Sequence, residues 1–257
     1  MKVVTLLENT TTRDDLTPQH GLSLYIETGT RRILFDMGQD DTFAKNAEKL
    51  GVDLTQVDMA IVSHGHYDHG GGLETFLQIN QKAPVYLHAD AFGAYYNGTE
   101  KYIGLDPMLA SHPRLMFTKG TMEIADGLLL TDGNDQNWRF DSWGLNRCEG
   151  DAFLADDFRH ELYLLIREGE KRILISGCSH KGIVNITRHF GADVLIGGFH
   201  LNKLEDSRKL QQIACQLLAE KTLYYTGHCT GSRQFAFLKE IMADRLEFLS
   251  TGAIIEA

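Results

Sequence analysis

The chain has 257 residues, of which 43% are hydrophobic and 23% charged, so it can bury a large core. Its formal net charge of −10 at pH 7 argues against a general attraction to nucleic acid or to anionic membranes. Four cysteines without paired spacing do not indicate a disulfide framework. No apolar run approaches the roughly 18 residues that span a bilayer, and the first residues lack the build of a signal peptide. We therefore expect a cytoplasmic protein with no membrane or nucleic-acid partner.

The first part of the chain predicts a β-hairpin followed by alternating helices and strands. Apolar-rich runs at residues 22–27 and 32–36 flank Thr28-Gly29-Thr30, a composition typical of a hairpin turn. Downstream, the apolar pattern predicts two helices, at residues 42–50 and 73–80, and two strands, at residues 59–63 and 84–88.

A polar, irregular segment follows at residues 131–151 and contains Trp138 and Trp143. A long loop with two tryptophans either packs over a core or lines a substrate pocket. Of these two alternatives we favour the pocket wall.

The second part of the chain repeats the order of the first. Runs at residues 162–167 and 172–176 flank Glu168-Gly169-Glu170, which predicts a second hairpin. Short strands are predicted at residues 193–197 and 222–226, and a helix at residues 203–221. Apolar residues recur there at helical spacing and give the helix one apolar face, formed by Leu210, Ile213, Ala214, Leu217 and Leu218.

The two hairpins have similar sequences, LYIETGTRRILFDMG and LYLLIREGEKRILISGC. Each is followed by a helix-like segment and then by another apolar strand. This weak internal repeat predicts two similar β-rich halves, at about residues 1–110 and 111–257, with their sheets packed face to face. No Pro- or Ser-rich linker separates the halves, so we expect a single domain over residues 1–257.

The densest group of chemically active side chains comes directly after the predicted strand at residues 59–63. His64, His66, Asp68 and His69 lie within six residues and are followed by Gly70-Gly71-Gly72. Zinc, manganese and iron bind His nitrogen and Asp oxygen. His64 and His66 can reach one ion, and Asp68 and His69 a second, while the glycines permit a tight turn. The spacing therefore predicts a metal site at the edge of a sheet.

Three more histidines lie where a predicted strand gives way to a loop: His180, His200 and His228. Loops at the strand ends of α/β folds gather into one site. We therefore expect these histidines to join the first cluster. His180 and His228 should lie within about 8 Å of it, since a Zn–N bond is about 2.1 Å long.

These motifs resemble the metallo-β-lactamase fold superfamily. Its His-x-His-x-Asp-His motif is matched by His64 to His69, its early Asp-x-Gly by Asp36-Met37-Gly38, and its late metal-binding histidine by His228. The resemblance covers nearly the whole chain. It implies an α/β (α+β) fold, an αββα four-layer sandwich, with two metal ions at one edge. Asp36 is expected to orient a ligand histidine or the metal loop rather than to touch a metal.

Within the superfamily the chain resembles a subgroup named after a dihydropterin-ribofuranosylaminobenzene phosphate synthase of methanopterin biosynthesis. The motifs that carry this resemblance are His20-Gly-Leu-Ser, Ser-His-Gly-His-Tyr-Asp-His, Gly-Cys-Ser-His180, Gly-Gly-Phe-His200 and Thr-Gly-His228-Cys-Thr-Gly. Many members of this subgroup are metallo-hydrolases, so the resemblance implies either hydrolysis or the synthase reaction.

The chain departs from the wider superfamily at two positions. A Gly-His-Thr-type motif before the second hairpin is missing, and Phe158-Arg-His160-Glu161 stands in that region. We expect His180 to supply the displaced ligand. Cys178 stands where many members have a bridging Asp. It is either a thiolate ligand, which would alter the metal preference, or a small buried residue.

The resemblance implies a site with two divalent ions, zinc first and manganese or iron as alternatives. Such ions share a hydroxide that can attack the substrate. Asp68 and His200 are the predicted catalytic residues, and His200 would donate a proton to the leaving group. The alternative for His200 is a hydrogen bond that orients a ligand. His20 and Tyr67 are expected to line the substrate pocket.

Two enzymatic functions remain open. The first is a metal-dependent hydrolase acting on a phosphoester or related anionic small molecule. The second is a transferase that condenses a dihydropterin diphosphate with an aminobenzene ribofuranosyl phosphate. A metal-retaining sensor is a third, non-enzymatic alternative. The expected partner is an anionic small molecule, and a homo-oligomer is possible.

Overall fold

The structure is a computed structural model that describes residues 1–256 of the chain. Its helices are α1 (Thr42–Lys49), α2 (Tyr67–Gly70), α3 (Leu73–Ile79), α4 (Ile183–Phe190), α5 (Ser207–Leu218) and α6 (Ser232–Met242). Short 3₁₀ turns are η1 (Leu54–Gln56), η2 (Pro107–Ser111), η3 (His228–Thr230) and η4 (Ala243–Arg245).

The strands form two large sheets and one small sheet. The first sheet contains β1 (Lys2–Leu7), β2 (Ser23–Glu27), β3 (Arg32–Phe35), β4 (Met59–Ile61), β5 (Val85–His88), β8 (Leu115–Thr118) and β18 (Ile254–Glu256). The second sheet contains β9 (Thr121–Ala125), β10 (Leu128–Thr131), β13 (Tyr163–Glu168), β14 (Lys171–Ser176), β15 (Val194–Ile196), β16 (Leu223–Thr226) and β17 (Leu246–Phe248). The small sheet contains β6 (Tyr95–Asn97), β7 (Lys101–Tyr102), β11 (Leu145–Glu149) and β12 (Ala152–Ala155).

The two predicted hairpins occupy equivalent positions in different sheets. The first sheet has the order β18-β1-β2-β3-β4-β5-β8, and the second β17-β16-β15-β14-β13-β10-β9. In the first, β1, β2 and β3 pair antiparallel, and β3, β4, β5 and β8 pair parallel. In the second, β10, β13 and β14 pair antiparallel, and β14, β15, β16 and β17 pair parallel. The similar hairpin sequences thus correspond to similar topology.

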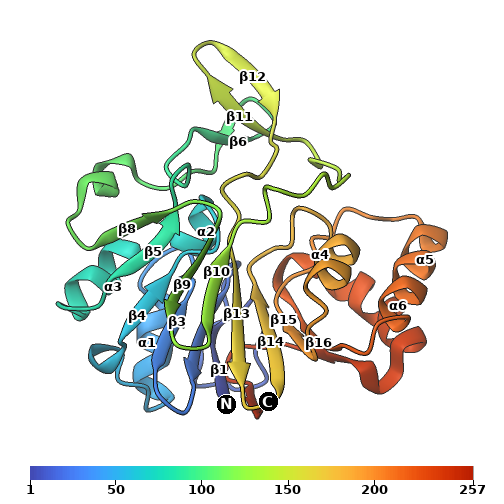
Figure 1. Cartoon of the computed structure of the whole chain (residues 1–257), viewed down its shortest axis with the longest axis horizontal. Helices are drawn as coiled ribbons and strands as arrows, with labels where there is room; N and C mark the ends of the chain where they lie inside the picture. Colours follow the sequence, from blue (N-terminus) through green and yellow to red (C-terminus); the bar gives the residue numbers. More distant parts are fainter. Residues whose placement is uncertain (257) are drawn as a thin grey trace.

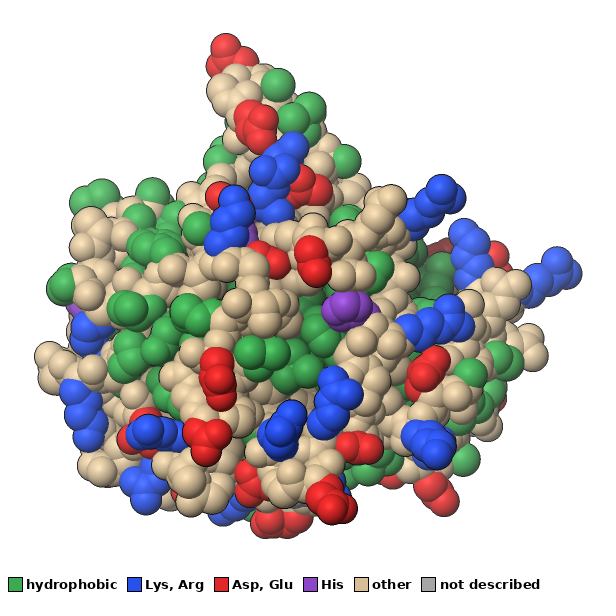
Figure 2. Space-filling model, viewed as in Figure 1, with side chains coloured by type: hydrophobic (Ala, Val, Ile, Leu, Met, Phe, Trp, Pro, Cys, Tyr) green, Lys and Arg blue, Asp and Glu red, His purple; other side chains and the backbone are tan. Residues whose placement is uncertain are grey.

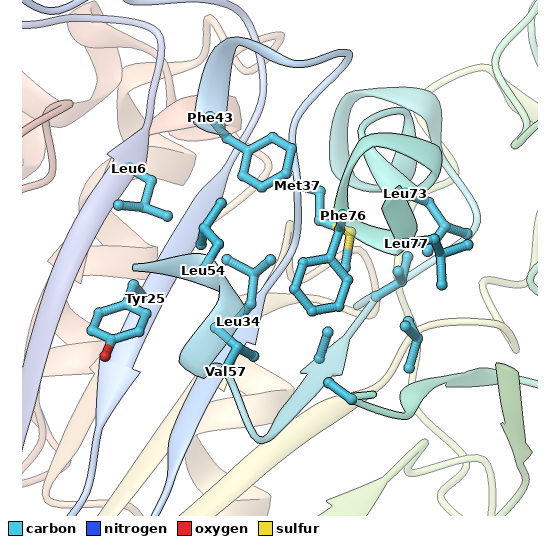
Figure 3. Packing of buried hydrophobic residues seen from close by; sticks show 14 of the residues in the cluster. Leu6, Tyr25, Leu34, Met37, Phe43, Leu54, Val57, Leu73, Phe76 and Leu77 are labelled. Carbon is cyan, nitrogen blue, oxygen red and sulfur yellow. The ribbon is translucent and has the colours of Figure 1, made fainter. Parts of the chain in front are cut away.

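Three apolar clusters separate four layers, which confirms the expected αββα sandwich (Figure 1). The central cluster lies between the sheets and joins residues such as Ile33 and Ile61 of the first to Ile173 and Ile196 of the second. On the outer face of the first sheet, Phe43 of α1 and Phe76 of α3 pack over strand residues (Figure 3). On the outer face of the second sheet, α4, α5 and α6 cover the third cluster.

Two features of the fold differ from the sequence predictions. The segment 131–151 is not wholly irregular, because β11 pairs with β6 from far away in the chain and with β12. The resulting arm extends above the body (Figures 1 and 2). The predicted helix at 203–221 is shorter, because the Asp206 side chain accepts the N–H groups of Arg208 and Lys209 and so fixes the start of α5 at Ser207. The arm and α6 were not predicted.

The predicted site lies where parallel strands of both sheets end. Asp36 follows β3, and the His64 to His69 segment follows β4. In the second sheet, residues 178–180 follow β14, His200 follows β15 and His228 follows β16. In residues 1–256, no helix is long and apolar enough to cross a bilayer.

Candidate metal centre

The loops after β4, β14 and β16 bring the predicted ligands together. Nε2 of His64 lies 3.3 Å from Nε2 of His180. Nε2 of His69 lies 3.1 Å from Nε2 of His228. These four side chains and His66 are buried, with at most 4% of each residue exposed. The convergence expected of His180 and His228 is therefore observed.

Two glycines allow the loops to approach this closely. A Cβ atom at Gly65 would lie 2.1 Å from the carbonyl oxygen of Ala91. A Cβ atom at Gly177 would lie 2.2 Å from Oγ of Ser63. Neither position can carry a side chain without moving the backbone or the serine that supports the histidines.

Asp36 orients the loop that carries His64 to His69. It is fully buried, and Oδ1 accepts the N–H of Ser63 at 2.7 Å. Its Oδ2 accepts a hydrogen bond from Oγ of Ser63 at 2.8 Å and one from Nδ1 of His69 at 2.6 Å. The Nδ1 of His69 is therefore the donor, and its Nε2 atom points to the centre of the site.

Asn9 fixes the orientation of the His228 ring in the same way. The backbone N–H of Gly21 donates to Oδ1 of Asn9 at 3.2 Å, which fixes that atom as the acceptor. Nδ1 of His228 donates to the same oxygen at 3.0 Å. The Nε2 lone pairs of His69 and His228 therefore face each other at 3.1 Å. A positive charge between them, from a proton or a metal ion, is needed to make this contact favourable.

The pair formed by His64 and His180 is arranged similarly. Oγ of Ser63 gives its proton to Asp36 and accepts one from Nδ1 of His64 at 2.8 Å. Nε2 of His64 is thereby left with its lone pair directed at His180. Nδ1 of His180 and Nε2 of His66 are buried without a hydrogen-bond partner. Buried polar atoms rarely remain unsatisfied, so these atoms indicate that a ligand belongs here.

Cys178 lies between the two imidazole pairs. Its Sγ atom is 3.2 Å from Nε2 of His69. It also lies within 4.8 Å of ligand atoms of His64 and His180 on one side, and of His69 and His228 on the other. The Cys178 thiol is therefore within reach of both imidazole pairs.

Asp68 faces the His69 and His228 pair. Its Oδ2 atom lies 3.4 Å from Nε2 of His228 and 3.9 Å from Nε2 of His69. The same oxygen lies 3.1 Å from Nε2 of His20. Because the His20 side chain is 49% exposed, it stands at the entrance to the site.

The centre opens into a cavity of about 130 Å³, which both His20 and Tyr67 line as expected. Lys101 of β7 and Lys203 also line it and were not predicted. Nζ of Lys101 donates to the Tyr67 hydroxyl at 3.3 Å. Lys101 reaches the site only because the small sheet folds over it, which no local pattern in the sequence indicates.

His200 lines this cavity too, and both of its ring nitrogens are buried without a hydrogen-bond partner. Its backbone has a φ of 50°, in the left-handed region that non-glycine residues rarely adopt. Asp36, Ser179 and His228 share this conformation, with φ between 48° and 60°. Strained backbone of this kind gathers at functional sites, where the surrounding structure maintains it.

Burial and neighbouring charges shift several pKa values in the centre. Burial lowers the pKa of His64 and His180 well below the usual value, and that of His66 to about 3. These three rings are neutral near pH 7 and their lone pairs are free. Burial also acts to lower the pKa of His69, but the carboxylates of Asp36 and Asp68 outweigh it and raise this pKa to about 9.

The segment that replaces the missing Gly-His-Thr motif supports the centre from outside. Nδ1 of His160 accepts the N–H of Gly65 at 2.9 Å, and its Nε2 lies 3.1 Å from the Asp156 carboxylate. Both nitrogens of His160 are therefore used. Glu161 accepts the backbone N–H of His180 at 2.8 Å and so fixes the loop that carries it. No role was predicted from the sequence for this segment.

The fold and the site define a four-layer sandwich with a histidine-rich centre where strands of both sheets end. The chain belongs to the metallo-beta-lactamase superfamily, whose family model matches residues 16–228. Zn(2+)-bound PqqB from Methylobacterium extorquens shares the fold, with a TM-score of 0.60 at 12% identity over 100% of both chains.

Two relatives are more similar. The chain is 30% identical over 268 residues to the 7,8-dihydropterin-6-methyl-4-(beta-D-ribofuranosyl)-aminobenzene-5'-phosphate synthase of Methanocaldococcus jannaschii, covering 93% of this chain and 90% of that protein. The crystal structure of Tm1679, a metal-dependent hydrolase of the beta-lactamase superfamily, matches with a TM-score of 0.87 at 28% identity, over 100% of this chain and 99% of that one. These findings confirm the resemblance to the synthase-like subgroup.

Proposed function

We propose that the protein is a metal-dependent hydrolase that cleaves a phosphoester or a related anionic small molecule. The observation that carries this proposal is the pair of buried imidazole contacts, His64 with His180 and His69 with His228, on either side of Cys178. Two sets of ligands separated by a thiol fit two divalent ions. The name of Tm1679 as a metal-dependent hydrolase supports the same class.

The residues divide into two ligand sets. His64, His66 and His180 would hold one ion, and Asp68, His69 and His228 the other, with Cys178 shared between them. Histidine and carboxylate ligands favour zinc, with manganese or iron as alternatives. When bound, such ions lower the pKa of water and stabilise negative charge on substrate oxygen.

The chain supplies the other requirements of hydrolysis. Lys101 and Lys203 give the cavity positive charge that would attract an anionic substrate. His20 and Tyr67 would contact the substrate at the entrance, and Asp68 would also act in catalysis. His200 has two unsatisfied ring nitrogens and would donate a proton to the leaving oxygen.

A transferase is the second candidate, because the Methanocaldococcus relative is named as a synthase. In that reaction an aminobenzene ribofuranosyl phosphate would form a bond to the dihydropterin and displace diphosphate, which would leave as the free anion. Lys101 and Lys203 would then bind the departing diphosphate.

Metal analysis combined with two assays tests the proposal. Protein purified without added metal should contain about two divalent ions per chain and should hydrolyse bis(4-nitrophenyl) phosphate. A chelator should abolish this activity, and the divalent metal should restore it.

His64→Ala should lose metal, whereas His189→Ala, a change in α4, should keep it. Diphosphate release that requires both pterin and aminobenzene substrates, without phosphodiester hydrolysis, would favour the transferase. Bound metal without either activity would favour a sensor.

A further inference from the structure

A second cavity adjoins the proposed metal centre. Its volume is about 290 Å³, and it shares His180 and His200 with the smaller cavity over the imidazoles. One wall is the loop of residues 139–143, which runs from β10 towards β11 (Figure 1). Residues of α4 and Ile213 of α5 also line it. The two histidines therefore stand at the junction of two spaces.

The two cavities differ in chemistry. The smaller is lined mainly by histidine, lysine, asparagine and carboxylate groups, which suit an anion. The larger is lined by eight polar or charged residues, among them Arg139, Asp141 and Arg188, and by seven apolar ones: Phe140, Trp143, Ile183, Val184, Phe199, Leu201 and Ile213. The aromatic and aliphatic part of this lining suits a flat, apolar group.

The loop wall is fixed in place. Nζ of Lys203 donates to the carbonyl oxygen of Trp143 at 2.8 Å, and Asp141 accepts the N–H of Trp143 at 2.8 Å. From α4, Asn185 donates to the carbonyl oxygen of Arg139 at 3.0 Å. The cavity is therefore formed before a ligand arrives, which lowers the cost of binding.

Unsatisfied polar atoms lie at the junction. Both ring nitrogens of His200 and Nδ1 of His180 are buried without a partner. The rings of His180 and His200 lie 4.2 Å apart, centroid to centroid. A ligand that spans the two cavities would place its polar linking atoms beside these nitrogens.

We infer that the larger cavity binds the leaving group of the substrate and that this group is flat and apolar, an aryl group. This inference rests on the proposed function, because the anionic phosphoryl group would occupy the smaller cavity. The phosphorus–oxygen bond to the aryl group breaks, and the oxygen of water bonds to phosphorus. The His200 proton passes to the aryl oxygen, and a proton from water restores the imidazole.

Equilibrium binding of two probes that cannot be hydrolysed tests this assignment. Phenylphosphonate and methylphosphonate carry the same anionic group and differ in the apolar group. The metal-loaded protein should bind phenylphosphonate about tenfold more tightly or better, because the phenyl ring buries more apolar surface. Binding is measured by calorimetry and by tryptophan fluorescence, and needs no turnover.

Variants then test whether the preference for phenylphosphonate arises in the larger cavity. Trp143→Ala should reduce the ratio of the two affinities to about one, whereas Trp138→Phe, outside this cavity, should leave it unchanged. Val184→Phe fills the cavity from α4 and should remove the preference without altering the loop, so it serves if Trp143→Ala does not fold. Equal binding of both probes to the wild type, or a preference that survives Val184→Phe, would overturn the inference. A Trp143-dependent preference in a protein without phosphodiesterase activity would uphold the cavity assignment and refute only the proposed function.

Discussion

The carboxylate of Asp36 lies 2.6 Å from Nδ1 of His69, and both side chains are fully buried. Asp36 follows β3 and His69 follows β4, so this contact joins the ends of two adjacent parallel strands. It fixes which nitrogen of His69 carries the proton and leaves Nε2 facing His228. The early Asp-x-Gly motif would thus act on the proposed metal centre through His69.

Replacing this carboxylate should weaken metal binding without removing any ligand. In Asp36→Asn, the amide can present its nitrogen to His69, so the ring loses its fixed orientation. We expect metal affinity to fall by about 10–100-fold, as is usual when such a partner is lost. Competition with a chromophoric chelator measures it. Asp41→Asn, an exposed change that affects only a pair with Lys45, is the matched control. Equal affinities in Asp36→Asn and the wild type would contradict this role.

Metal binding should release protons near neutral pH. Because the pKa of His69 in the metal-free protein is raised to about 9, its ring is protonated at pH 7.5 and must lose a proton to bind metal. Burial raises the pKa of Cys178, so a thiolate ligand would release a second proton. Calorimetry in buffers of different ionisation enthalpy should give about two protons for the wild type and about one for Cys178→Ser. Release of no proton by either protein would contradict the assignment.

The raised pKa of His69 also predicts how pH affects the stability of the metal-free protein. The folded pKa of His69 lies above the usual 6.5, so protonation stabilises the folded state. This contribution is fully present below about pH 6.5 and is lost as pH rises through about 9. The thermal midpoint of chelated protein should therefore fall over this window. The fall should be smaller in His69→Gln, and an equal fall in both proteins would assign the effect to other groups.

Cobalt substitution tests Cys178 as a ligand. If its thiolate binds metal, the cobalt-loaded protein should have the near-ultraviolet charge-transfer absorption of a thiolate–cobalt bond. Cys178→Ser should lose this band. Cys229→Ser is the matched control, because Cys229 is also buried nearby but contacts backbone atoms of Cys178 and His200. A band that survives in Cys178→Ser and vanishes in Cys229→Ser would assign the ligand to Cys229.

Replacing His200 should separate catalysis from metal binding. His64, His66, Asp68, His69, His180 and His228 would supply enough ligands for two ions, so His200→Ala should keep its metal. Turnover should fall by about 10²–10⁴-fold, the usual contribution of a positioned general acid. Steady-state kinetics and metal analysis on one preparation measure both. Loss of metal, or full activity on the true substrate, would assign His200 a different role.

The sequence alone determined the features that depend on neighbouring residues. Apolar-rich runs on either side of short turns predicted both hairpins, because strand pairing across a tight turn is local. The His64 to His69 segment predicted a metal site, because three histidines and one aspartate within six residues lie in one short stretch of backbone. Histidines at strand ends predicted the convergence, because the loops at the strand ends of α/β folds gather into one site.

Only the tertiary structure decided which side chains support that centre. Asn9 contacts His228 across 219 positions, and His160 contacts Gly65 across 95. The small sheet that carries Lys101 exists because β6 pairs with the distant β11. Such contacts join segments whose local patterns contain no information about each other. They form because burying the two sheets against one another brings the segments together and leaves their polar groups no other partners.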